Sequence, residues 1–80
     1  MSEQYKVNRR QWDSQRVRAL RRHLGLTQRE LADRLGTRQQ TISEWEKGMY
    51  KPRGASSTLL FMIAERAKFK YKANPAEEKP

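Results

Sequence analysis

Apolar residues along the chain recur at helical spacing. Val17, Leu20 and Leu24 fall on one side of a helix that we expect over 14–24, and further short apolar stripes follow it. No strand pattern competes with this interpretation, because the Asn-Gly and Asp-Gly turns typical of hairpins are absent. The pattern therefore predicts an all-α domain over residues 12–70.

The ends of the first two helices carry start and stop residues. Asp13 is placed to cap the first helix, and Gly25 follows its last turn at a position that favours a left-handed conformation. The segment TQRE has the sequence of a capping box, in which Thr27 and Glu30 satisfy each other's backbone amides. We therefore expect the second helix to begin after Thr27 and to end at Gly36.

A very short turn leads into the third helix. Only Gly36 and Thr37 separate the two helices, and we expect Thr37 to cap a helix over 38–47. The loop that follows contains Pro52, which cannot continue a helix, and a last helix is predicted over 57–69. Two short helices joined by a tight glycine-containing turn make a helix-turn-helix unit.

Composition narrows the possible functions. At 80 residues the chain has room for one small domain. It has no cysteine for a disulfide or a thiolate metal site, and its single histidine, His23, cannot form a metal cluster. We therefore expect neither a metal nor a cofactor. There is also no Gly-rich phosphate loop and no Cys or Ser nucleophile motif, so the protein is not expected to be an enzyme.

The charge of the chain is strongly positive. It has 18 Lys and Arg residues against 9 Asp and Glu, a formal net charge of +9. This excess favours a polyanionic partner, with nucleic acid ahead of an anionic membrane surface, although solubility alone is the alternative explanation. No apolar run approaches the roughly 20 residues of a membrane-spanning helix, and the N-terminus lacks the apolar core of a signal peptide. A soluble, cytoplasmic protein is expected.

Both ends of the chain are polar. Residues 1–11 show no apolar periodicity and carry Arg9 and Arg10, so we expect a flexible basic arm, with entry of its arginines into a minor groove as a second possibility. Residues 71–80 are polar and contain proline, and we expect a disordered tail.

The helix over 38–47 has an unusual outward side. Ile42 and Trp45 define its inward side, and the opposite side is polar and includes adjacent glutamines, Gln39 and Gln40. A glutamine amide can donate and accept together, and so can pair with N7 and N6 of adenine in the major groove. The alternatives are that glutamine is simply tolerated at a surface, or that Gln40 completes a capping box with Thr37.

The segment LTQRELADRLGTRQQTISEWEKG resembles the bipartite helix-turn-helix of the phage repressor and Cro-like family, the xenobiotic-response-element type of regulator. Gln28 matches the family's glutamine at the start of the first helix of the unit, Ala32 its small residue at the helix crossing, Gly36 its turn and Ile42 its buried aliphatic residue. The resemblance covers residues 17–52. It implies a small lambda-repressor-like bundle of four to five helices and a DNA-binding transcriptional regulator, with repression as the expected mode of action.

The resemblance also implies roles for individual side chains. Five residues stand at or beside the family's base-reading positions: Arg38, Gln39, Gln40, Ser43 and Glu44. Gln28 stands at a position that usually contacts a phosphate. Four cations nearby are expected to contact phosphates as well: Arg29, Lys47, Lys51 and Arg53. Glu44 departs from the neutral residue that many relatives carry. A carboxylate can accept only from cytosine N4 and is repelled by phosphates, so two roles stay open: Glu44 reads a base, or it merely screens one.

Glu46 lies closer to the buried side of its helix than to the outward side. A buried carboxylate without a partner would cost several kcal/mol. Arg21 on the first helix is the family-matched candidate for a structural ion pair with it. The alternative is that both charges are solvated.

The last helix has two apolar sides. One side is expected to complete the core and comprises Leu59, Leu60, Ile63, Ala64 and Ala67. The other side groups Phe61, Met62 and Phe69 around Glu65, and a helix that is apolar on two sides must bury both. We expect a homodimer through this second side on a palindromic operator, with half-sites one DNA turn apart. The alternative is that the arm, with Tyr5 and Val7, covers it.

The main rival function is a protein-interaction module, such as an antitoxin or coactivator, that binds a partner protein through the helix over 57–69 and the stretch KFKYK. Membrane binding is not expected, because no predicted helix pairs a lysine-rich side with a wide apolar one.

Overall fold

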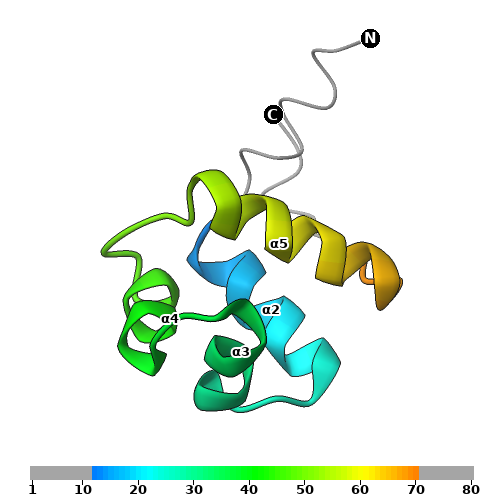
Figure 1. Ribbon diagram of the computed structural model, residues 1–80, viewed down its shortest axis with the longest axis horizontal. Helices are drawn as coiled ribbons and strands as arrows, with labels where there is room; N and C mark the ends of the chain where they lie inside the picture. The colour runs from blue at the N-terminus through cyan, green and yellow to red at the C-terminus, as the bar shows by residue number, and fades with distance from the viewer. Residues whose placement is uncertain (1–11, 71–80) are drawn as a thin grey trace, which may run out of the picture.

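Four helices form the part of the protein that the computed structural model describes, residues 12–70. They are α2 (Ser14–Leu24), α3 (Gln28–Leu35), α4 (Gln39–Glu46) and α5 (Gly54–Arg66). In Figure 1, α5 runs across the top of the bundle, and α3 and α4 form the opposite side. No strand occurs between residues 12 and 70, so the predicted all-α fold is confirmed. No helix in this part of the chain is long and apolar enough to span a membrane.

The core draws at least one fully buried side chain from each helix: Val17, Leu20, Leu31, Ile42 and Leu60. Trp12, just before α2, and Trp45 of α4 are buried in the same core cluster. Burial of each large aliphatic side chain contributes roughly 1.5–3 kcal/mol. These contacts hold α4 by its inward side and leave its other side open.

The predicted helix ends are confirmed for α2 and α3. The Asp13 carboxylate accepts a hydrogen bond from the Arg16 amide at 2.9 Å. Thr27 and Glu30 form the reciprocal capping box, with bonds of 3.1 and 2.8 Å. Gly36 ends α3 with φ of 72°, in the left-handed region where a side chain would be strained. The tight turn between α3 and α4 therefore depends on a backbone conformation that only glycine adopts without strain.

The predicted capping of α4 by Thr37 is wrong. The helix begins at Gln39, its N-cap is Arg38, and no side chain caps it. The Thr37 amide instead donates to the Ala32 carbonyl at 2.9 Å, so Thr37 closes α3. Gln40 consequently completes no capping box with Thr37.

The last helix begins and ends three residues earlier than predicted, at Gly54 and Arg66. Lys68 adopts a left-handed φ of 54°, and the Phe69 amide donates to the Ala64 carbonyl at 2.9 Å, which turns the chain back at the end of α5. The expectation that Leu59 lies in the core is also wrong, since it is 38% exposed.

The predictions for the basic arm and the tail lie outside the described residues. They concern residues 1–11, with Tyr5, Val7, Arg9 and Arg10, and residues 71–80, which include the end of the KFKYK stretch.

Candidate nucleic-acid interface

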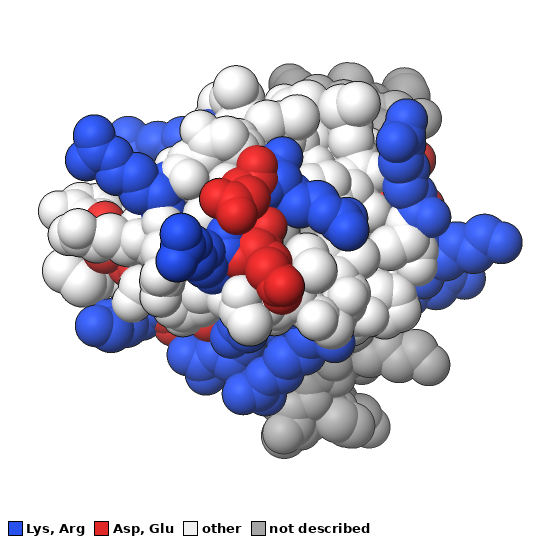
Figure 2. All heavy atoms as spheres, turned by 60° about the horizontal axis from the view of Figure 1, so that its bottom comes forward, with Lys and Arg blue, Asp and Glu red and all other residues white. Residues whose placement is uncertain are grey.

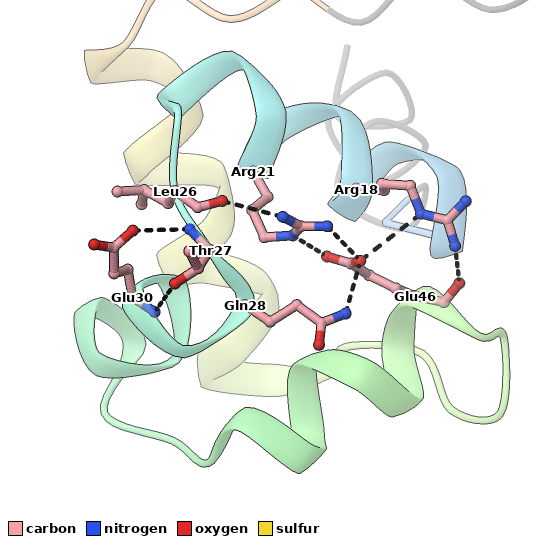
Figure 3. A network of polar contacts seen from close by, with 7 residues as sticks. All are labelled: Arg18, Arg21, Leu26, Thr27, Gln28, Glu30 and Glu46. Carbon is pink, nitrogen blue, oxygen red and sulfur yellow. Dashed lines mark hydrogen bonds and ion pairs between the residues drawn. The ribbon is translucent and has the colours of Figure 1, made fainter.

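Glu46, at the end of α4, is buried with 4% of its surface exposed and is held by Arg21 of α2. The Arg21 Nε donates to Glu46 Oε2 at 2.7 Å and Nη2 donates to Oε1 at 3.0 Å. The remaining Arg21 Nη1 donates to the Leu26 carbonyl at 3.1 Å. The structure thus brings together the two residues that the sequence suggested as an ion pair, and joins them to the α2–α3 linker (Figure 3).

Two further side chains reach Glu46, and sequence reasoning assigned neither to it. Gln28 Nε2 donates to Glu46 Oε1 at 3.1 Å. Arg18 of α2 donates from Nη2 to the Glu46 carbonyl at 2.9 Å and places Nε 3.7 Å from Oε1. Arg18 and Arg21 are three residues apart and so lie on one side of α2. This spacing is the signal in the sequence that could have suggested Arg18 as a second partner of Glu46.

The network explains the protonation state of Glu46. Burial by itself would raise the pKa of Glu46, but the hydrogen bonds from Arg21 and Gln28, with the charges of Arg21 and Arg18, together hold that pKa below its ordinary value. The hydrogen bond to Glu46 correspondingly raises the pKa of Arg21, against the effect of burial. Both groups therefore remain charged near neutral pH, and α2, α3 and α4 are tied together at one point.

The outward side of α4 presents polar groups on this fixed support. Ile42 and Trp45 are buried on its inward side. The outward positions are those expected to read bases: Arg38, Gln39 and Gln40, which are exposed, and Ser43 and Glu44, which are half-buried. One interaction connects them, from Gln40 Nε2 to Glu44 Oε2 at 3.1 Å. This side therefore offers amide, hydroxyl and carboxylate groups at positions one helical turn apart.

The cations expected to contact phosphates all lie on the surface: Arg29, Lys47, Lys51 and Arg53. Lys51 and Arg53 line a shallow cleft between the α4–α5 loop and the first turns of α5. Gln28 is half-buried, and one of its amide hydrogens is already bonded to Glu46. In Figure 2, which brings the lower side of Figure 1 forward, small acidic groups lie at the centre with Lys and Arg around them.

A profile of the helix-turn-helix family matches residues 17–66, which is more than half of the chain. The chain belongs to the helix-turn-helix family. One similar protein is an uncharacterized HTH-type transcriptional regulator from Methanothermobacter thermautotrophicus, 56% identical over 36 residues, which are 45% of this chain and 52% of that protein. A second, with the same description, from Archaeoglobus fulgidus is 49% identical over 49 residues, which are 61% of this chain and 66% of that protein.

The match covers less than two thirds of the length of each of these two relatives. No solved structure matches the chain significantly. The family match starts within α2 and ends at the last residue of α5, so it includes residues of all four helices. Within it, α3 and α4 are the two helices of the unit, and the Glu46 network lies where they meet α2.

The predicted second apolar side of α5 is divided in this helix-turn-helix protein: Phe61, Glu65 and Phe69 line one hollow beside Trp12, and Met62 lies on the open surface. Phe69 lies beyond the helix and packs against the core of its own chain, and Phe61 is half-buried. Met62 and Glu65 are exposed. Leu59 lies one turn before Met62 and is also exposed, so the open apolar surface of α5 is formed by Leu59 and Met62, which are 38% and 51% exposed.

Proposed function

We propose that this chain is a sequence-specific double-stranded DNA-binding transcriptional regulator that reads the major groove with α4. One observation carries the proposal: Gln39 and Gln40 are exposed in the first turn of a helix whose other side is fixed by Ile42, Trp45 and Glu46. In a helix-turn-helix unit, N-terminal residues of the second helix contact base edges. The description of both relatives as HTH-type transcriptional regulators supports the proposal.

Each polar group on this surface has a role in the proposed complex. The glutamine amides would read base edges, with Arg38, Ser43 and Glu44 beside them. The four exposed cations named above would contact phosphates. Gln28 keeps its carbonyl oxygen and one amide hydrogen, and that hydrogen remains able to donate to a phosphate while the other is bonded to Glu46.

We propose repression as the mode of action, because repression requires only that the protein occupy its site. Activation would require a further, specific contact with the transcription machinery. A reporter gene placed behind the DNA sequence that the protein binds should therefore lose expression when the protein is produced. A rise in expression would contradict repression and leave DNA recognition intact.

We also propose that the protein binds a palindromic operator as a homodimer, with Leu59 and Met62 of α5 at the interface and Glu65 beside them. Apolar side chains one helical turn apart on an open surface favour such a contact. Sedimentation of the protein with a duplex carrying two half-sites should give two protomers per duplex. Replacement of Met62 by Ser should remove the cooperativity between the two half-sites, and a wild-type protein that binds the duplex as a single protomer would contradict the dimer.

The same exposed residues favour a second candidate, an antitoxin- or coactivator-type module that binds another protein through α5. The two functions differ in what they need from α4. If DNA reading is the function, substitution of Gln39 and Gln40 abolishes the preference for one DNA sequence over another. If partner binding is the function, the same substitutions leave the partner bound, and Met62→Ser removes it.

Selection of bound duplexes from a random pool tests the proposal. We expect a defined sequence to emerge and to bind at least about a thousandfold more tightly than random DNA. Each phosphate neutralised contributes about −0.9 to the slope of log affinity against log salt, so four cations predict about −3 to −4 per protomer. Equal affinity for all duplexes, or no binding, would remove the proposed function.

A further inference from the structure

The hydrogen bond between Gln40 and Glu44 fixes which way the Gln40 amide points. The bond joins Gln40 Nε2 to Glu44 Oε2 at 3.1 Å across one turn of α4. A carboxylate has no hydrogen to donate, so only the NH2 group of the amide can face it. The carbonyl oxygen of Gln40 is therefore directed away from Glu44.

We propose that Glu44 is a positioning residue that makes the base pair facing Gln40 prefer adenine over guanine. The inference rests on the proposed function, because it assigns a base preference to the same surface. It gives a role to the one carboxylate among the side chains on the outward side of α4.

The preference follows from the hydrogen-bonding groups that remain on Gln40. An unrestrained amide NH2 has two hydrogens, and the bond to Glu44 occupies one of them. One donor and one carbonyl acceptor are left, which match N7 and the N6 amino group of adenine. Guanine presents two acceptors, N7 and O6, on the same edge, so one of them would face the Gln40 carbonyl oxygen unpaired.

The charge of Glu44 has a separate effect. A carboxylate beside the groove is repelled by the phosphates of any sequence. Glu44 is half-buried, so contact with DNA would exclude water from it and reduce the screening. The hydrogen bond should thus govern the adenine-to-guanine ratio, whereas the charge should lower affinity for every duplex.

Two substitutions separate these effects. In Glu44→Gln the new amide oxygen still accepts from Gln40, so the adenine preference should remain while affinity for all duplexes rises. In Glu44→Ala affinity should also rise, but the preference should fall. Asp33→Ala is the matched control, because it removes an exposed negative charge from α3 and leaves α4 unchanged.

Binding constants for duplexes that differ only at the base pair read by Gln40 provide the test. That pair is found in the selected site as the one whose preference disappears in Gln40→Ala. We expect the wild type to bind the adenine duplex about tenfold more tightly than the guanine duplex. The ratio should stay near tenfold in Glu44→Gln and Asp33→Ala, and should fall to about twofold or less in Glu44→Ala.

The proton resonances of the Gln40 side-chain NH2 group in the DNA-free protein provide a second measurement. They should move in Glu44→Ala while those of Gln39 stay in place, and unmoved Gln40 resonances would contradict the positioning role. A wild type that prefers guanine at this pair, or an unchanged ratio in Glu44→Ala, would overturn the inference while leaving sequence-specific binding intact. Absence of any sequence preference in the wild type would instead remove the proposed function.

Discussion

Replacement of Arg21 by Met should destabilise the fold far more than the loss of an ordinary surface charge. Methionine keeps the apolar stem of the side chain and removes the guanidinium. Two hydrogen bonds to the Glu46 carboxylate, of 2.7 and 3.0 Å, and one of 3.1 Å to the Leu26 carbonyl are lost together. The Glu46 side chain, only 3% exposed, would keep Gln28 as its one hydrogen-bond donor, with Arg18 Nε at 3.7 Å.

Removal of one partner from a buried ion pair typically costs about 3–5 kcal/mol. The lower end applies here, because the Arg18 side chain is 44% exposed and able to move toward the carboxylate. A loss of about 3 kcal/mol lowers the melting temperature of so small a domain by about 12–24 °C. It is also a large share of the stability of about 4–12 kcal/mol expected for 80 residues.

Thermal and urea denaturation followed by circular dichroism at pH 7 measure this change. Arg22→Met is the matched control, since Arg22 is the exposed neighbour of Arg21 on the same helix, and its loss should cost less than about 1 kcal/mol. A variant with Met at both 21 and 46 should be more stable than Arg21→Met alone, because no unpaired charge remains buried. Equal, small losses in Arg21→Met and Arg22→Met would refute the reasoning, because they would mean that the pair is solvated.

Three other perturbations follow from the same contacts. Since the pKa of Glu46 lies below its ordinary value of 4.5 in the folded protein, the stabilisation is complete above that pH and is lost as pH falls through the lower, folded-state value. Melting temperatures measured from pH 6 to 3 should therefore fall more steeply in the wild type than in Glu46→Gln, and parallel curves would contradict this. Thr27→Ala should cost about 1 kcal/mol in urea denaturation through loss of the capping box, whereas no loss would show that the box adds nothing. Gly36→Ala should cost about 1–2 kcal/mol because φ is 72° there, and an unchanged midpoint would show that the turn tolerates a side chain.

Local signals made much of the fold predictable from the sequence. Capping depends on residues three positions apart, so Asp13, Thr27 and Glu30 could be assigned without knowledge of the tertiary structure. Gly25 and Gly36 marked helix ends because a left-handed residue is needed there. These signals located α2 and α3 to the residue.

Contacts that form only when helices meet could not be predicted. Gln28 looked like an exposed first-turn residue, and it reaches Glu46 only because α3 and α4 pack together. Thr37 had the chemistry of a cap, but its amide is used to close α3. Phe69 fitted the period of a helix that in fact ends before it. In each case a tertiary or backbone requirement outweighed the local pattern.

The most direct test of the central claim is the combined substitution of Gln39 and Gln40 by Ala. The wild type and the variant would be titrated against the selected duplex and a scrambled duplex of the same composition. Since both side chains are exposed, the variant should melt at the same temperature and bind scrambled DNA as well as the wild type, but should no longer distinguish the two duplexes. A variant that still prefers the selected duplex to the wild-type extent would contradict the claim that α4 reads the bases.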